Sequence, residues 1–229
     1  MKNSGGGVLI LVISVFDYEL EPIRHEMVTF EEGKVLNRDY IRGVIGRNEI
    51  VAASGILGKV EAAFITQKFL DLYNIDCVVL LSGAGAIPEN LKIGDLVVGD
   101  EYMEYDRQLG NKDCLELFKG CPKLISLLKK DIPEIKVGKI VSGDAIVNST
   151  QRKKELGEKY NALALDMDSA AVAKVAAING TAFISAKVIL DLSDENTNID
   201  FDKYFENYSQ IPAQFFAGFL LRHFLKKEC

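Results

Sequence analysis

The stretch from Leu163 to Asp191, LALDMDSAAVAKVAAINGTAFISAKVILD, constrains the fold of this chain most. Asp166 and Asp168 precede an alanine-rich run of good helix formers, which an Asn-Gly pair ends. Thr181–Leu190 then forms a β-branched, almost uncharged run that is typical of a buried strand. A helix followed by a buried strand predicts an α/β protein. The acid that ends this strand, Asp191, lies where open α/β sheets bind ligands. The alternative is that Asp166 and Asp168 cap the helix and that Asp191 is a solvated loop acid.

The same pattern of a strand followed by a small or acidic loop recurs along the chain. Val8–Val15 is an apolar run followed by Glu19, which could be catalytic or could simply favour a helix start. Later runs end in SGILGK at Ser54, in SGAGA at Ser82 and in SGDAIVN at Ser142. If these strands share one orientation, their loops converge on one edge of the sheet. We therefore expect a single α/β domain over residues 1–229 with a mixed or mainly parallel sheet, after a loose end at residues 1–7.

Composition excludes several classes of function. The 229 residues carry a net charge of −6 with no basic cluster, which argues against nucleic acid as a partner. No run approaches the roughly 18 apolar residues that cross a bilayer, and Val8–Phe16 is better explained as a first strand than as a signal peptide. The four cysteines show no CxxC spacing and the chain has two histidines, so we expect reduced thiols in a cytoplasmic protein. A zinc site or a histidine-based triad is not indicated.

Six motifs occur in the order found in one known family. They are SGILGK, SGAGA, LKIGDLVVGDE, IVSGDAIVN, LDMDSAAVA and the acid after KVIL, spread from about Val8 to Phe224. In this order the chain resembles the nucleoside phosphorylase-like proteins, and most of all the 5′-methylthioadenosine/S-adenosylhomocysteine nucleosidases. The resemblance implies a three-layer α/β/α fold around a mixed, largely parallel sheet. It also implies a homodimer and hydrolysis of a purine N-glycosidic bond without a cofactor.

The resemblance also implies roles for individual residues. Glu19 matches the acid that activates water, and Asp191 matches the acid that protonates the purine at N7. Asp168 takes the place of a ribose-binding glutamate, and Met167 that of a methionine under the sugar. The other implied contacts to a small-molecule purine nucleoside involve Val147 at the base, Phe201 at the 5′-substituent, and Ser54, Ala84, Gly85, Ile146 and Asp166.

The chain departs from the family pattern at four places. The Glu-Met-Glu motif is Asp166-Met167-Asp168 here, so that each acid is one methylene shorter. Ile146 replaces a purine-stacking aromatic residue, and Leu190 replaces a serine. The SGILGK turn has one residue more than the usual SGIGK. Both catalytic acids are retained.

General chemistry supports the two acid roles. Cleavage of an N-glycosidic bond places negative charge on the purine, which an acid can neutralise, while a carboxylate can take a proton from water. For Asp191 to act as an acid its pKa must be raised by burial, and Lys187 would oppose this if it pointed the same way.

Three other functions stay open at this stage. A phosphorylase on the same fold would use phosphate in place of water, but the chain lacks an arginine-rich loop exit for it. A nucleoside-binding protein without turnover is compatible with the altered ribose and purine positions. A futalosine-type hydrolase would change only the 5′-substituent.

Overall fold

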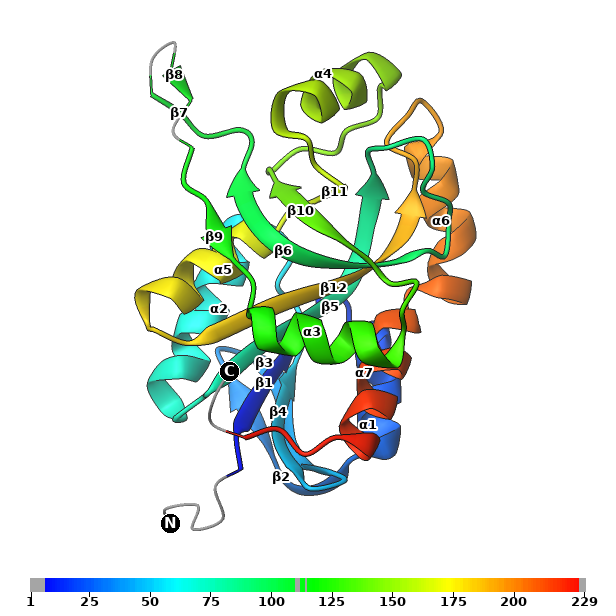
Figure 1. Cartoon of the computed structure of the whole chain (residues 1–229). Helices are drawn as coiled ribbons and strands as arrows, with labels where there is room; N and C mark the ends of the chain where they lie inside the picture. The colour runs from blue at the N-terminus through cyan, green and yellow to red at the C-terminus, as the bar shows by residue number, and fades with distance from the viewer. Residues whose placement is uncertain (1–6, 110–111, 114, 227–229) are drawn as a thin grey trace.

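The computed structural model describes residues 7–109, 112–113 and 115–226, and Figure 1 shows the course of the chain. Of the expected loose end, residues 1–6 lie outside this part. The strands are β1 (Leu9–Ile13), β2 (Val28–Val35), β3 (Arg38–Ile45), β4 (Asn48–Ala53), β5 (Cys77–Ala86), β6 (Leu96–Glu104), β7 (Gln108–Leu109), β8 (Lys112–Asp113), β9 (Phe118–Lys119), β10 (Lys136–Ser142), β11 (Ala164–Asp166) and β12 (Ala182–Asp191). The helices are the 3₁₀ turn η1 (Asp17–Leu20), α1 (Glu21–Glu26), α2 (Lys59–Leu72), α3 (Pro122–Asp131), α4 (Thr150–Tyr160), α5 (Ser169–Ile178), α6 (Thr197–Tyr208) and α7 (Ile211–Arg222).

The main sheet is mixed. Its strand order is β11-β10-β6-β12-β5-β1-β4-β3-β2. β1 pairs in parallel with β4 and β5, and β5 pairs in parallel with β12. The ends of β1, β4, β5 and β12 therefore meet at one edge, as expected from their loops. Antiparallel pairs join β2 to β3, β3 to β4, β9 to β6 and β6 to β12.

One further pairing closes part of the sheet into a ring. β11 pairs antiparallel with β5 through Ala164 opposite Ala86, while it also pairs in parallel with β10. The strands β5, β12, β6, β10 and β11 therefore form a closed circuit. β10 runs opposite to β5 and β12, so the loop after β10 reaches the same cavity from the other direction.

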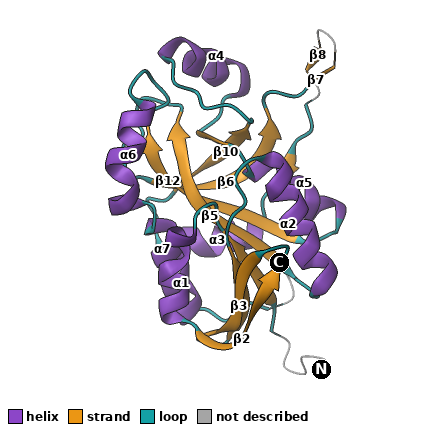
Figure 2. Cartoon of the chain, turned by 180° about the vertical axis from the view of Figure 1, so that it is seen from behind, coloured by secondary structure: helices purple, strands orange, loops and turns teal. Residues whose placement is uncertain are grey.

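Helices cover both faces of the sheet, which confirms the predicted α/β fold. In Figures 1 and 2, α2 and α5 lie together on one side, whereas α1, α6 and α7 lie on the other. The alternation of β1 explains this arrangement, because successive side chains point to opposite faces. Leu9, Leu11 and Ile13 belong to the core that includes α2 and α5. Ile10 and Val12 belong to the core that includes α1, α3 and α7.

Two local expectations about secondary structure were wrong. The charged sequence from Asp113 to Lys130 predicts one helix, but the helix begins at Pro122, after the short strand β9. The segment Ser82–Ala86, expected to be a loop, is the last part of β5. Its small residues are needed because a side chain at Gly83 would collide with Leu190 of the neighbouring β12. Within the described residues, no helix has the length and apolar character needed to cross a bilayer.

Candidate active site

A cavity of about 530 Å³ lies where the loops after β1, β5, β10 and β12 meet helix α6. Most of the residues predicted from the sequence line it: Glu19, Ala84, Gly85, Ile146, Val147, Asp166, Met167, Asp168, Asp191 and Phe201. Ser54 is the exception. Its hydroxyl donates to Asp17 Oδ1 (2.9 Å) beside a separate cleft. Segments more than 170 residues apart in the sequence are thus brought to one cavity.

Glu19 is buried in the cavity wall, with only 1% of its surface exposed. Three residues separate the 3₁₀ turn η1 from the end of β1, and the turn places this side chain against Gly83 of β5. Glu19 Oε2 accepts a hydrogen bond from the Phe16 N–H (2.8 Å), and Oε1 accepts one from the Gly83 N–H (3.2 Å). Burial raises the pKa of Glu19 to about 7, although the Phe16 N–H, the charge of Lys187 and the Gly83 N–H all act to lower it. A carboxyl group with this pKa can exchange a proton near neutral pH.

Asp191 ends β12 at the same cavity. Its Oδ1 accepts hydrogen bonds from the Ser193 N–H (2.8 Å) and from the Thr197 hydroxyl (3.2 Å). Burial raises the pKa of Asp191 despite these two contacts. Among the described residues all its hydrogen bonds involve Oδ1, so Oδ2 is left for a ligand. Asp191 is therefore not the solvated loop acid of the alternative interpretation.

Lys187 lies beneath the cavity and is completely buried. Its ammonium group contacts Asp166 Oδ2 (2.8 Å) and Asp168 Oδ1 (2.9 Å), and it donates to the Ser82 hydroxyl (2.6 Å). Lys187 pairs with Asp166 and Asp168 rather than with Asp191, and the pKa of Asp191 stays raised by burial, so the opposition considered from the sequence does not prevent this shift. Burial alone would lower the pKa of Lys187, but the two carboxylates raise it.

The two acids of the LDMDS motif differ in their surroundings. Asp166 accepts hydrogen bonds from the hydroxyls of Ser142 and Ser169 and from the Ser169 N–H, in addition to its contact with Lys187. Burial would raise the pKa of Asp166, but Lys187 and these donors hold it below its usual value. Burial and the charge of Asp166 raise the pKa of Asp168. Asp166 is thus occupied by protein partners, and Asp168 is the acid better placed to meet a ligand.

The rest of the wall is mostly apolar. Phe201 projects from α6 and its ring centroid lies 6.3 Å from that of Phe16. Ile146 lines the cavity and is 60% exposed, at the position where the resemblance implies an aromatic residue. The Val147 carbonyl accepts a hydrogen bond from the Thr197 hydroxyl (3.3 Å), which also contacts Asp191.

Several lining or supporting residues were not predicted. They include Leu57, Thr197, Asn198 and Asp202 in the wall and the Lys187 contacts below it. Lys187 could have been found, because a lysine within an otherwise apolar strand needs a carboxylate partner when it is buried. Nothing in the local sequence distinguishes Thr197 from other helix-start residues.

The second cleft, beside Ser54, is lined by Arg24 and Arg38 among others. Arg24 pairs with Asp17 and Glu21, and Arg38 pairs with Glu61. Among the described residues that line the 530 Å³ cavity itself, none is basic. The cavity therefore offers carboxylates and apolar surface, and no cation to hold an anion.

Comparison with known proteins identifies the relatives of this chain. The model of the phosphorylase superfamily matches residues 9–221. A 5′-methylthioadenosine/S-adenosylhomocysteine nucleosidase of Thermotoga maritima is 42% identical over 220 residues, covering 96% of this chain and 99% of the relative. An aminodeoxyfutalosine nucleosidase of Helicobacter pylori is 28% identical over 217 residues, and the match covers 89% of this chain and 94% of the relative.

The fold has close solved counterparts. One is a mutant of the Helicobacter pylori 5′-methylthioadenosine/S-adenosylhomocysteine nucleosidase with 5′-methylthioadenosine in the active site. It is 26% identical, has a TM-score of 0.88, and the match covers 95% of this chain and 100% of that one. These matches confirm the resemblance that the six motifs indicated. The chain belongs to the phosphorylase superfamily.

Proposed function

We propose that this protein is a purine nucleosidase that hydrolyses the N-glycosidic bond of 5′-methylthioadenosine, S-adenosylhomocysteine or both, and releases adenine. The observation that carries the proposal is that the carboxyl groups of Glu19, which is buried, and Asp191, which is half-buried, line one cavity and both have raised pKa values. The relatives named above support the choice of substrate.

Each carboxyl group has one task in the proposed reaction. Asp191 donates a proton from Oδ2 to the purine N7 as the bond between C1′ and N9 breaks and its electron pair moves to the base. Glu19 takes a proton from water as the water oxygen bonds to C1′. The products are adenine and the 5-substituted ribose, and proton exchange with solvent restores both acids. General acid–base assistance of this kind contributes about 10²–10⁴-fold.

The remaining wall would hold the substrate. Asp168 accepts hydrogen bonds from the ribose hydroxyls, with Met167 beside the sugar and the Val147 backbone at the purine edge. Ala84 and Gly85 of β5 present a flat surface without bulky side chains. Phe16, Phe201 and Leu57 supply an apolar site for a thioether substituent. Ser54 and Asp166 then serve the site indirectly, through their contacts with Asp17 and Lys187.

Hydrolysis is preferred to phosphorolysis because of charge. Phosphate binding usually relies on arginine or lysine, and the described lining of the cavity contains neither. Arg24 and Arg38 lie at the second cleft and are paired with acids there. A phosphate dianion in place of the water would also be repelled by the carboxylate of Glu19.

The proposal includes three statements about the whole protein. We take residues 1–229 as a single domain, the location as the cytoplasm, and the assembly as a homodimer. Leu57 and Ile146, both at least half exposed, lie at the cavity mouth where a second subunit could cover them. Light scattering coupled to size-exclusion chromatography measures the assembly directly, and a monomer at micromolar concentration would contradict it.

The experiment for function is a substrate panel. The protein is incubated with 5′-methylthioadenosine, S-adenosylhomocysteine, aminodeoxyfutalosine, adenosine and inosine, with and without phosphate, and the free base is measured. We expect adenine from the first two at rates that do not depend on phosphate. A requirement for phosphate with formation of a ribose 1-phosphate would show a phosphorylase instead. Binding without release of any base would show a nucleoside-binding protein.

A further inference from the structure

The loop that follows β10 forms one wall of the cavity and is tied to the start of α2. Ala145, Ile146 and Val147 line the cavity, and Asp144 comes directly before them. Helix α2 begins at Lys59 after Gly58, which has no side chain to cap the helix. Asp144 Oδ1 supplies the missing cap by accepting a hydrogen bond from the Lys59 N–H (3.0 Å).

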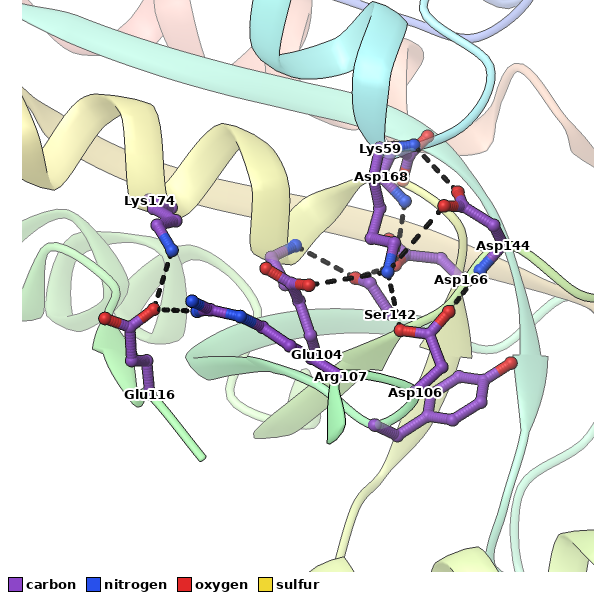
Figure 3. Close-up of polar contacts among 12 residues, drawn as sticks. Lys59, Glu104, Asp106, Arg107, Glu116, Ser142, Asp144, Asp166, Asp168 and Lys174 are labelled. Atoms are coloured by element: carbon purple, nitrogen blue, oxygen red, sulfur yellow. Dashed lines mark hydrogen bonds and ion pairs between the residues drawn. The ribbon is translucent and has the colours of Figure 1, made fainter. Parts of the chain in front are cut away.

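The side chain of Lys59 strengthens the same connection. Its ammonium group lies 2.5 Å from Asp106 Oδ1, 3.4 Å from Glu104 Oε2 and 3.7 Å from Asp144 Oδ2. Figure 3 shows the ammonium group between these carboxylates, and we call the four residues the Lys59 cluster. The cluster has three carboxylates and one ammonium group, so removing Lys59 leaves three like charges close together.

The Lys59 cluster also holds the loop by a hydrogen bond to the backbone of the loop. Asp106 Oδ2 accepts a hydrogen bond from the Asp144 N–H (2.9 Å), so Asp106 contacts both Lys59 and the loop. Next to it, the Tyr105 hydroxyl donates to the Ala145 carbonyl (2.9 Å). At the far end of the loop, Thr197 joins the Val147 carbonyl to Asp191. The loop is therefore fixed at both ends, by the Lys59 cluster and by Thr197.

We infer that Lys59 is a positioning residue for the nucleoside: its ammonium group bridges the three carboxylates, reduces their mutual repulsion and so keeps the Ala145–Val147 wall at the distance that the purine requires. Lys59 does not itself line the cavity, and it acts through Asp144 and Asp106. This inference rests on the proposed function, since it assigns the wall to the purine. The wall contacts the base before and during bond cleavage. Its displacement therefore weakens the binding of the substrate and of the transition state alike.

The test is a comparison of KM and kcat for 5′-methylthioadenosine in purified full-length variants. Lys59→Met keeps the aliphatic stem and removes the charge. We expect KM to rise about tenfold, the equivalent of one charge-assisted contact, with kcat changed less than about threefold. Lys59→Arg restores the charge and should return KM to within about threefold of the wild-type value.

Two further variants separate positioning from a general loss of structure. Lys174→Met is the matched control, because Lys174 on α5 pairs with Glu116, as Figure 3 shows, and does not contact the Ala145–Val147 loop. It should leave KM unchanged. The double variant Lys59→Met with Asp106→Asn returns the net charge of the Lys59 cluster to its wild-type value. Its KM should lie between those of Lys59→Met and the wild type.

The outcomes are distinguishable. If the wild type releases no adenine from 5′-methylthioadenosine, the proposed function fails and the substrate panel decides what replaces it. If the wild type is active and Lys59→Met has an unchanged KM, the inference about Lys59 is wrong. A fall in melting temperature with unaltered KM, or a fall in kcat alone, would also overturn it, because either would assign Lys59 a purely structural or a chemical role.

Discussion

At the scale of single residues, the site consists of two acids that differ in how many of their oxygens are occupied. Both oxygens of Glu19 accept backbone N–H groups, whereas the hydrogen bonds of Asp191 within the described chain all involve Oδ1. Hydrogen bonds from N–H groups stabilise the ionised form of a carboxyl group, as the proposed base Glu19 requires. A carboxyl oxygen without a protein donor can carry a proton, as the proposed acid Asp191 requires.

Asp191→Asn tests the proposed role of Asp191 as proton donor. An amide can still hydrogen-bond the purine N7 but cannot easily transfer a proton to it. We expect kcat to fall by at least about 10²-fold while KM stays nearly unchanged. Steady-state kinetics with 5′-methylthioadenosine measure both, and wild-type turnover in this variant would remove Asp191 from its proposed role.

Glu19→Gln tests the base and its burial together. Hydrolysis should be abolished. The pKa of Glu19 is raised from 4.5 to about 7, so the folded state holds a proton that the unfolded state loses within this window. The free energy of unfolding of the wild type therefore falls as pH rises from about 4.5 to 7, by roughly 3 kcal/mol from this group.

The glutamine variant does not ionise and should lack this contribution. The free energy of unfolding of the variant minus that of the wild type should therefore be larger at pH 8 than at pH 5. Urea unfolding of both proteins at the two pH values measures this difference. An equal difference at the two pH values would mean that Glu19 is not buried as a titrating group.

At the scale of elements, β5 is adapted to its neighbour β12. Gly85 lies opposite Asp191 in the sheet, and a Cβ at this position would be 2.9 Å from Asp191 Oδ1 and closer still to the Ser193 hydroxyl. Gly85→Ala should therefore displace Asp191 and lower kcat by about 10²-fold, the usual effect of a misplacement of about 1 Å.

The control for this variant is Gly218→Ala in α7, where the new Cβ would meet only the flexible end of Arg222 at 3.3 Å. Its kcat should equal that of the wild type. If Gly85→Ala also keeps full kcat, the close approach of β5 to Asp191 does not position the acid.

The same elements show how much could be predicted from the sequence. The strand before Asp191 and the helix from Ser169 were predicted nearly to the residue, because long apolar runs with clear stop signals determine them locally. The continuation of β5 through SGAGA could not be predicted, since small residues are permitted in loops and are required here by side chains distant in the sequence, Leu190 beside Gly83 and both Asp191 and Ser193 beside Gly85. Lys187 was recognised as a charge in a buried strand, but its partners depend on ring closure.

At the scale of the whole molecule, Lys187 joins four elements: β12, which carries it, β5 through Ser82, the end of β11 through Asp166, and the start of α5 through Asp168. Removing one partner of a buried ion pair leaves an uncompensated charge. Lys187→Met should therefore lower the free energy of unfolding by about 3–5 kcal/mol.

The matched control is Lys139→Met. Lys139 pairs with Glu101 at 3.5 Å with its side chain 21% exposed, and its loss should cost less than about 1 kcal/mol. Chemical denaturation of both variants measures the difference. Equal losses would show that the buried network adds no more than a surface pair.

The pairing of β11 with β5 has a consequence for biosynthesis. β5 emerges from the ribosome about a hundred residues before β12, and its partner β11 also comes late, so a nascent chain carries an apolar strand with one edge open until residue 191 has been made. No product truncated before residue 191 can contain both Glu19 and Asp191 or close this ring. In a cell-free translation experiment with chains of increasing length, catalytic turnover should therefore appear only in chains that extend past residue 191.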